Sequence, residues 1–214
     1  VVTDFQKTGK GLGSNRWESE AGKNLLLSVV LRPEFLEPHY QFYLNKFVSL
    51  GVYDFIRSLL PYKKISVKWP NDVYIDDHKV AGILINNTIK GRHFEFVVAG
   101  VGVNINQEEF FSDAPNPVSV IHYLKDPLDL EKCLKVLLTC LNDRYRHLEN
   151  QQWSKIDSDY IDALYRLDVQ SAFLAGNDSF NGRIKGVSEY GMLLIQHQNG
   201  EILEFDFKEV EFIQ

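Results

Sequence analysis

The chain has 214 residues, of which 44% are hydrophobic and 24% are charged, and its formal net charge is -6. This length and composition indicate a globular protein with one main core and a small appended part. The negative charge argues against general nucleic-acid binding. The apolar runs, such as Leu25 to Leu31 and Val97 to Val103, are too short to span a bilayer, and no charged-then-apolar leader opens the sequence. We therefore expect a soluble, cytoplasmic protein with no membrane segment.

The first sixty residues predict a strand, a glycine-rich loop, a second strand and a helix. Val1 to Phe5 has the pattern of a strand, and residues 9–22 form the loop. Asn24 to Leu31 predicts a buried strand that Pro33 ends. Pro38 then opens a helix whose apolar residues recur at intervals of three and four, which is typical of a core-facing helix. These residues are Tyr40, Leu44, Phe47, Val48, Phe55, Ile56 and Leu59.

The middle of the sequence predicts an antiparallel or mixed meander of strands followed by helices. The strands cover Lys64 to Trp69, Val73 to Ile75, Val80 to Ile85 and Phe94 to Val101. A long helix follows from about Leu130 to Leu148, and a shorter one from about Trp153 to Leu164. The apolar face of the long helix comprises Leu130, Cys133, Leu134, Leu137, Leu138, Leu141, Tyr145 and Leu148. The two cysteines, Cys133 and Cys140, lie roughly 10 Å apart on this helix and cannot pair with each other.

From Val169 onward the pattern changes to short alternating strands with tight turns. The turn signals include Glu189-Tyr190-Gly191 and the hairpin signal Asn199-Gly200. This pattern predicts a small β-barrel that begins near residue 168. The expected fold class is thus α+β, with one domain over residues 1–167 and a second over 168–214.

The charge is unevenly distributed along the sequence. Residues 1–92 contain 13 Lys or Arg and 9 Asp or Glu, a net charge of +4, whereas residues 93–214 contain 10 and 20, a net charge of -10. The basic half is where we look for a phosphate site. The alternative, that the asymmetry is only solvated surface, stays open on this observation alone.

The first segment that can carry chemistry is the glycine-rich loop from Gly9 to Trp17. Its glycines leave backbone N–H groups free to face an anion, and Lys10 and Arg16 supply positive charge. Such a loop can hold a phosphate, although many glycine-rich loops are only flexible connectors. It is not a Walker A loop, because no Gly-Lys-Ser/Thr opens a helix after a strand.

The second segment is Lys68-Trp69-Pro70-Asn71-Asp72, at the end of a predicted strand. Asp72 is suited to hold Mg²⁺ and Asn71 to hydrogen-bond a ligand. The alternative is an Asx-type turn under a buried Trp69.

The third segment runs from Lys79 to Leu84 and places a lysine at the start of an apolar strand, three residues before Gly82. A strand lysine beside a glycine suits a ligand that lies against the backbone. The alternative is a charge on an edge strand.

Taken together and in this order, the segments resemble the motifs of biotin protein ligases. Those motifs are a glycine-rich loop ending in Trp, then Lys-Trp-Pro-Asn-Asp, then Lys-x-Ala-Gly-Ile-Leu, then Gly-x-Gly-x-Asn, which here is Gly100 to Asn104. The resemblance covers residues 1 to about 125 by motif, and the layout of the remainder agrees with it. It implies a mixed or antiparallel sheet packed with helices, as in class II aminoacyl-tRNA synthetases and biotin ligases, and a C-terminal SH3-like barrel.

The resemblance also implies an activity and a set of site residues. Biotin and ATP would be the substrates, with Mg²⁺, and biotinyl-AMP would pass its biotin to a lysine of a biotin carboxyl carrier domain of a carboxylase. Lys79, Lys10 and Asp72 would be catalytic, with Asp72 also near the metal. Lys79 would bridge carboxylate and phosphate, and Lys10 would close over the product. The biotin-binding residues would be Gln6, Gly9, Lys10, Gly11, Lys79, Gly82 and Gly100. The ATP-binding residues would be Trp17, Lys68, Asn71, Gly102 and Asn104.

The sequence departs from the family pattern in the loop and at its start. Lys10 stands where arginine is usual, Leu12 where arginine or glutamine is usual, Ser14 where glycine is frequent and Asn15 where arginine is common. Lysine keeps the positive charge but lacks the planar guanidinium of arginine, which can bind a carboxylate or phosphate through two hydrogen bonds. We therefore expect weaker retention of the adenylate. The family's upstream strand and helix, with a Ser/Thr-Asn pair that binds biotin, has no counterpart in this sequence. No helix-turn-helix module is present either, and we expect no DNA binding.

Two alternatives to a biotin ligase remain at this stage. A lipoate or octanoate protein ligase shares the fold and the adenylate chemistry but lacks Lys-Trp-Pro-Asn-Asp. A non-enzymatic sensor of biotin or biotinyl-AMP would be consistent with Leu12 and with the missing upstream segment. The sequence leaves open whether the protein is a monomer or a homodimer.

Overall fold

The computed structural model describes residues 1–11, 16–112 and 114–213 of the chain. The strands are β1 (Val2–Thr3), β2 (Gly9–Lys10), β3 (Arg16–Trp17), β4 (Leu25–Leu31), β5 (Ile65–Lys68), β6 (Asp72–Ile75), β7 (His78–Lys90), β8 (His93–Val103), β9 (Gln170–Ala175), β10 (Asp178–Val187), β11 (Leu193–His197), β12 (Ile202–Phe205) and β13 (Glu211–Phe212). The helices are α1 (Phe42–Leu59), α2 (Leu130–Glu149) and α3 (Trp153–Asp162), with 3-10 turns η1 (Pro38–Tyr40) and η2 (Val120–Tyr123).

The central element is a six-stranded sheet in the order β1-β4-β8-β7-β6-β5. Every neighbouring pair in it is antiparallel, so the predicted meander is confirmed as antiparallel. The β7–β8 hairpin is longer than predicted and extends to Lys90. The strand predicted over Val1 to Phe5 is shorter, because only Val2 and Thr3 pair with β4.

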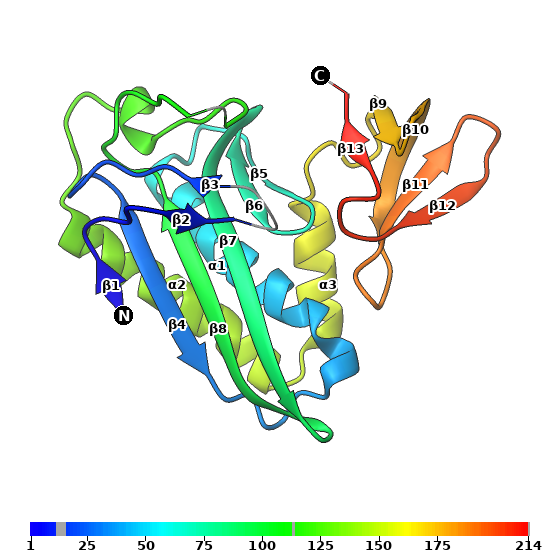
Figure 1. The fold of residues 1–214 in the computed structure, drawn as a ribbon, viewed down its shortest axis with the longest axis horizontal. Coiled ribbons are helices and arrows are strands. Elements are labelled where there is room, and N and C mark those ends of the chain that lie inside the picture. The colour runs from blue at the N-terminus through cyan, green and yellow to red at the C-terminus, as the bar shows by residue number, and fades with distance from the viewer. Residues whose placement is uncertain (12–15, 113, 214) are drawn as a thin grey trace.

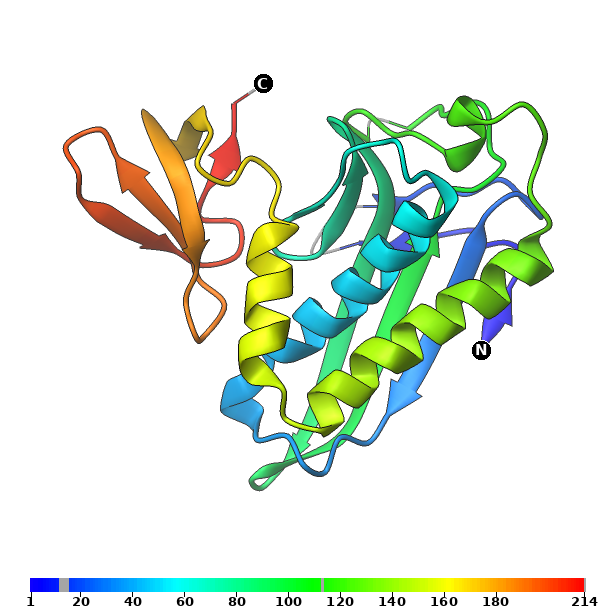
Figure 2. The same ribbon diagram turned by 180° about the vertical axis from the view of Figure 1, so that it is seen from behind.

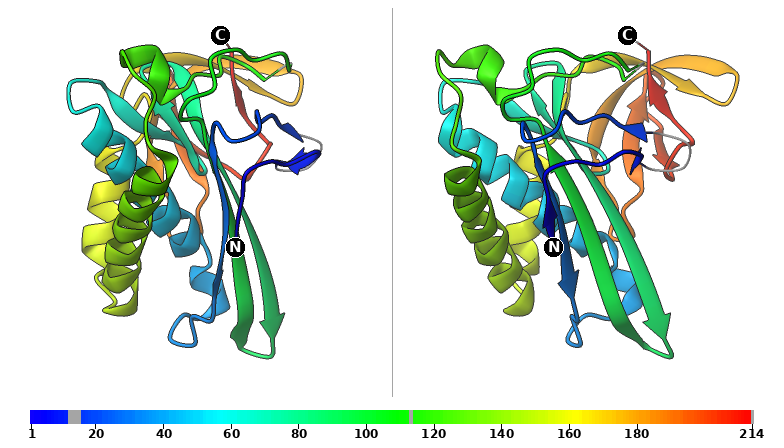
Figure 3. Two further views of the ribbon diagram at one scale, coloured as in Figure 1. Left: turned by 90° about the vertical axis from the view of Figure 1, so that its left-hand side faces the viewer. Right: turned by 60° about the vertical axis from the view of Figure 1, so that its left-hand side comes forward.

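The helices cover one face of this sheet, and the β2–β3 ribbon lies on the other (Figure 3). Figure 2 shows α1 and α2 across the sheet with α3 beside α1, and Figure 1 shows the ribbon from the opposite side. Because strand side chains alternate between faces, Val97, Ala99 and Val101 of β8 are buried against the helices. Val98, Gly100 and Gly102 therefore face the ribbon side, which is where the candidate site lies.

Helix α2 begins at a well-formed N-cap and packs through a narrower face than the sequence predicts. The Asp129 carboxylate accepts hydrogen bonds from the backbone N–H groups of Glu131 and Lys132 at 3.0 and 3.1 Å. Cys133, Leu137, Leu141 and Leu148 are buried. The assignment of Leu138 to the core face was wrong: it is 43% exposed. Leu138 borders an apolar hollow beside β4, lined also by Leu31 and Tyr145, so it lies at the margin of the helix contact.

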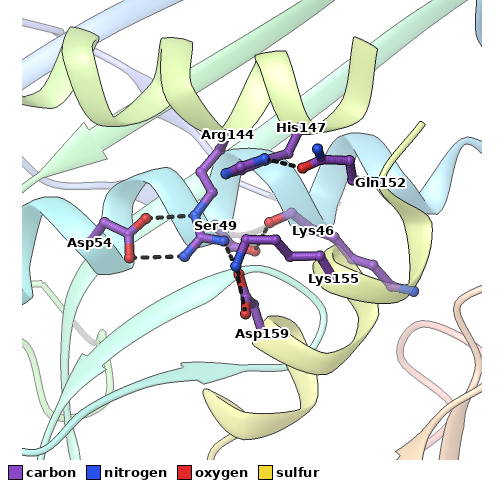
Figure 4. Close-up of polar contacts among 8 residues, drawn as sticks. All are labelled: Lys46, Ser49, Asp54, Arg144, His147, Gln152, Lys155 and Asp159. Atoms are coloured by element: carbon purple, nitrogen blue, oxygen red, sulfur yellow. Dashed lines mark hydrogen bonds and ion pairs between the residues drawn. The ribbon is translucent and has the colours of Figure 1, made fainter. Parts of the chain in front are cut away.

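An arginine at the centre of the helix layer joins all three helices (Figure 4). The Arg144 guanidinium of α2 donates to both carboxylate oxygens of Asp54 on α1, at 2.6 and 3.0 Å. It also donates to Asp159 on α3, which accepts a further bond from Lys155 at 3.0 Å. The Arg144 side chain is only 13% exposed. This network connects the three helices by charge-assisted hydrogen bonds.

The C-terminal sheet, β9 to β13, is antiparallel in the order β12-β11-β10-β9-β13 and lies beside α3 (Figure 1). The two predicted turns are confirmed, and Gly191 and Gly200 both adopt positive φ, +94° and +91°, which glycine accommodates without strain. The pairings found in the described residues form an open line from β12 to β13, so closure into a barrel stays a prediction.

Cys133 and Cys140 are free, as expected. Across the described ranges, no helix is long and apolar enough to cross a membrane.

Candidate functional site

Two glycines and a tryptophan form a flat floor on the ribbon side of the sheet. Gly82 of β7 and Gly102 of β8 pair across the strands. A β-carbon at Gly82 would lie 2.9 Å from Cζ3 of Trp17, and one at Gly102 would lie 2.6 Å from its Cε2. Any other residue type at either position would therefore push the indole away. At Gly100 the nearest atom to such a β-carbon is the Leu84 carbonyl oxygen at 3.5 Å, so the floor continues beyond the indole without obstruction.

The β2–β3 ribbon carries Trp17 onto this floor. Gly9 pairs with Trp17 and Lys10 with Arg16. A β-carbon at Gly9 would lie 2.6 Å from the Trp17 carbonyl oxygen and 3.0 Å from Oε1 of Gln6. Gln6 and Gly9 thus lie next to Trp17, Gly11 continues from Lys10, and Lys10 itself is exposed. The sequence departures at Leu12, Ser14 and Asn15 fall outside the described residues.

Lys79 borders the floor and forms an ion pair with Asp72. Lys79 Nζ lies 2.6 Å from Asp72 Oδ2, with the two side chains 27% and 29% exposed. Its Cε would lie 3.5 Å from a β-carbon at Gly82. The alternative that Lys79 is an edge-strand charge was wrong, because β7 lies between β6 and β8. At Lys79 the backbone bonds instead to the segment 116–118, with Lys79 N–H donating to the Asn116 carbonyl and Val118 N–H to the Lys79 carbonyl.

Asn104 follows β8 and presents a buried amide oxygen. Its side chain is held by a 3.1 Å hydrogen bond from Nδ2 to the Val118 carbonyl. The residue is 3% exposed, and its Oδ1 has no hydrogen-bond partner among the described residues. The Trp17 Nε1 is also buried and has no hydrogen-bond partner among the described residues. Buried polar atoms are nearly always paired, so these two atoms are candidates to meet groups of a ligand.

Two of the predicted ATP-binding residues turn toward other parts of the fold. Lys68 Nζ lies 3.3 Å from the Tyr74 hydroxyl and 5.1 Å from the centre of the Phe212 ring. Burial lowers the pKa of Lys68, although the nearby Asp72 carboxylate opposes this. Asn71 Nδ2 donates to Oδ1 of Asn45 on α1 at 2.9 Å. Contacts of Lys68 and Asn71 with a nucleotide stay predictions.

Some residues around the floor were missed by the sequence reasoning. Ser28 of β4 lies opposite Gly100 and shares its face of the sheet, as does Leu84, the last residue of the third segment, to which no role was given. The segment 116–118, which holds both Lys79 and Asn104, was also missed. Alternation along β4 would have placed Ser28 opposite the buried Leu27, but the register that brings it beside Gly100 is not encoded locally.

The arrangement suits a ligand with a flat apolar body and an anionic end. Gly100 leaves an open surface beside the Trp17 indole, which covers Gly82 and Gly102, and Lys79 supplies positive charge at its border. Within the described part of the chain, no group of three or more His, Cys, Asp or Glu residues is close enough to hold a metal ion. Assistance of a cation by Asp72 stays a prediction.

The model of the biotin/lipoate A/B protein ligase family matches residues 1–104. This range contains β1 to β8, the floor and the Lys79–Asp72 pair. Over these 104 of its 214 residues, the chain resembles the biotin/lipoate A/B protein ligase family. The family resemblance inferred from the four motifs is thereby confirmed.

Curated members of the family resemble the chain over almost all its length. The bifunctional ligase/repressor BirA of Bacillus spizizenii is 28% identical over 206 residues, 94% of this chain and 62% of that protein. The biotin--[acetyl-CoA-carboxylase] ligase of Paracoccus denitrificans is 26% identical over 205 residues, covering 94% and 85%. The chain thus spans less than two thirds of the length of the BirA proteins that it matches.

The fold has solved counterparts in the family. The biotin protein ligase from Aquifex aeolicus in complex with biotin and ATP superimposes with a TM-score of 0.81 at 23% identity, covering 100% of this chain and 88% of that one. At this identity the likeness concerns the fold, and it agrees with the mixed α+β class expected from the sequence.

Proposed function

We propose that the chain is the catalytic part of a biotin protein ligase, which uses ATP to form biotinyl-5'-AMP and transfers the biotin to a lysine of a biotin carboxyl carrier domain. The observation that carries the proposal is the position of Lys79, at the border of the glycine floor and 2.6 Å from Asp72. The names of the relatives support it, since they include a biotin--protein ligase and a biotin--[acetyl-CoA-carboxylase] ligase.

In the first half-reaction, a biotin carboxylate oxygen attacks the α-phosphorus of ATP and pyrophosphate leaves. Biotin would lie on the floor at Gly100, next to the Trp17 indole that covers Gly82, and beside Gln6, Gly9, Lys10 and Gly11. Trp17, Lys68, Asn71, Gly102 and Asn104 would bind the nucleotide, with the Asn104 oxygen meeting a donor group. Lys79 would hold the carboxylate and offset the negative charge that grows on the α-phosphoryl oxygens, and the fixed geometry replaces a bimolecular encounter. Lys10 would close over the adenylate.

In the second half-reaction, the carrier lysine attacks the carbonyl carbon of the mixed anhydride and AMP leaves. A free lysine has a pKa near 10.4, so the amine must lose a proton first. Asp72 is the carboxylate we assign to that proton. It would also contribute one oxygen to Mg²⁺ carried by the triphosphate, and this ion would offset charge on the leaving pyrophosphate. A single carboxylate fits such a phosphate-borne ion, which usually takes one or two from the protein.

The organisation that accompanies this function is part of the proposal. Residues 1–167 would form the catalytic domain, and residues 168–214 a small SH3-like domain. The protein would act in the cytoplasm, as a monomer or a homodimer. Its partner would be the carrier domain of a biotin-dependent carboxylase, as the name of the Paracoccus relative suggests.

Exchange of labelled pyrophosphate into ATP tests the proposal, run on this chain with biotin and, separately, with lipoate. Exchange that requires biotin is the expected result. Exchange with lipoate alone would instead indicate a lipoate ligase. No exchange with either, together with measurable binding of biotin, would indicate a sensor, and both of these outcomes contradict the proposal.

A further inference from the structure

Trp69 of the Lys-Trp-Pro-Asn-Asp segment contacts the C-terminal sheet instead of the floor. Its indole Nε1–H donates to the carbonyl oxygen of Gly191, in the β10–β11 turn, at 2.9 Å. Its ring lies 5.2 Å from the ring of Phe207, between β12 and β13. Trp69 is 9% exposed. The side chain therefore joins the end of β5 to two separate turns of the C-terminal sheet.

The residue before it makes a third contact of the same kind. The Lys68 ammonium lies above the Phe212 ring of β13 at 5.1 Å, close enough for a cation–π interaction. Two consecutive residues at the end of β5 are thus held by three turns or strands of the C-terminal sheet.

The β5–β6 hairpin connects these contacts to the Lys79–Asp72 pair. Lys68 lies opposite Asp72 in the β5–β6 ladder, and Asp72 Oδ2 lies 2.6 Å from Lys79 Nζ. The intervening turn is fixed as well, because the Tyr160 hydroxyl donates to the Pro70 carbonyl at 2.7 Å. A displacement of Trp69 is therefore passed to Asp72 through a short, hydrogen-bonded hairpin.

The β10–β11 turn that contacts Trp69 is also packed tightly against α1. Gly191 has φ +94°, and a β-carbon there would overlap the ring of Phe42, the first residue of α1. The Phe42 ring also lies 6.3 Å from that of Phe207. The C-terminal sheet is thus seated on α1 and Trp69 together, with little freedom to shift.

We propose that Trp69 is a positioning residue through which the C-terminal sheet sets the place of Asp72, and through Asp72 that of Lys79. The kinetic part of this inference rests on the proposed function. The C-terminal sheet would act more on the reaction rate than on biotin binding, because Lys79 is only one of the groups assigned to biotin and the Trp17 indole contacts Gly82 and Gly102 independently of Trp69.

The test compares two phenylalanines of the C-terminal sheet. Phe207→Ala removes the ring that packs on Trp69, whereas Phe180→Ala removes a ring that packs with Phe173, Phe205 and His197. We expect Phe207→Ala to lower the kcat of biotin-dependent pyrophosphate exchange about tenfold and to change the KM for biotin by less than about threefold, since misplacing a catalytic group by about 1 Å can cost up to about 10²-fold. Trp69→Phe should have the same effect, and Phe180→Ala should lower Tm without changing kcat.

A double-mutant cycle separates positioning from general weakening. In an Asp72→Asn background, Phe207→Ala should change kcat less than about twofold, because residues that act through one another are non-additive. A full tenfold loss in that background, an equal loss in Phe180→Ala, or an unchanged kcat in Phe207→Ala would each overturn the proposal.

Hydrogen exchange distinguishes failure of this inference from failure of the proposed function. Phe207→Ala should speed amide exchange in peptides covering residues 65–75 and leave peptides covering 93–103 unchanged. This measurement needs no activity, so it applies even if the parent chain shows no exchange of pyrophosphate. Unchanged protection of residues 65–75 would refute the positioning contact itself.

Discussion

The indole of Trp17 lies against the backbone of Gly102 so closely that a β-carbon at Gly102 would be 2.6 Å from Cε2. Atoms cannot approach to that distance, so a side chain at this position must move the indole. At Gly100, two residues earlier on the same face of β8, a β-carbon would meet only the Leu84 carbonyl oxygen, at the ordinary distance of 3.5 Å.

Gly102→Ala should therefore displace Trp17, and Gly100→Ala should not. The chain has three tryptophans, so labelling with 5-fluorotryptophan gives three ¹⁹F resonances, which single Trp→Phe substitutions assign. We expect the Trp17 resonance alone to shift in Gly102→Ala, and none to shift in Gly100→Ala. Equal spectra for the two variants would show that Trp17 does not lie on the glycine floor in solution.

Lys79→Gln should reduce biotin-dependent pyrophosphate exchange by about 10²-fold or more, the usual cost of losing one preorganised group that stabilises developing charge. Lys90→Gln is the matched control, because Lys90 is the exposed last residue of the same strand. It should retain the parent rate. Similar rates for the two variants would remove Lys79 from the proposed chemistry.

Lys10→Arg should slow the release of biotinyl-AMP about three- to tenfold, because a guanidinium can bind carboxylate or phosphate through two parallel hydrogen bonds. A chase of bound radiolabelled adenylate with unlabelled adenylate measures the release rate. Lys7→Arg, at an exposed residue nearby, should leave the rate unchanged. A slower release in both variants would point to a general effect of arginine on the ribbon.

Arg144→Met should lower the free energy of unfolding by about 2–3 kcal/mol, as measured by urea titration at pH 7. Removing one partner of a fully buried pair costs about 3–5 kcal/mol, and the partial exposure of Asp54 and Asp159 reduces that. Lys135→Met breaks the exposed i,i+4 pair with Glu131 and should cost less than about 0.5 kcal/mol. Equal costs would mean that the helix-joining network adds no stability.

The stability lost in Arg144→Met should depend on pH. Burial alone would raise the pKa of Asp159, but hydrogen bonds from Arg144 and Lys155 outweigh it and hold the pKa below the ordinary 3.8. A carboxyl with a lowered folded-state pKa stabilises the fold above its unfolded pKa, and this stabilisation is lost as pH falls through the folded value. The difference between parent and variant should thus be constant above about pH 5 and shrink below about pH 4. A constant difference down to about pH 3 would exclude Asp159 as its source.

The local elements of this fold were largely predictable from the sequence. Helices α2 and α3 begin and end within two residues of their expected bounds, and α1 ends at Leu59 as expected but begins at Phe42, because residues from Pro38 to Tyr40 form a separate 3-10 turn. The apolar spacing of α1 and the Asp129 cap of α2 act over one or two turns. The tight turns at Gly191 and Gly200 were also predicted, since a positive φ is a property of one residue. The motifs gave Lys79 and Asp72, whose contact lies within a single hairpin.

What the tertiary structure decided is where distant segments meet. The sequence determined that glycines occupy positions 82 and 102, but their pairing under Trp17 depends on the register of β7 with β8 and on the docking of a separate ribbon. The apolar spacing of α2 assigned Leu138 to the core, but Leu138 is exposed in the structure. The sequence also did not indicate that Trp69 contacts Gly191, 122 residues away. Periodicity and turn chemistry reflect free energies within a few neighbouring residues, whereas register and side-chain direction at a turn follow from which surfaces are buried together.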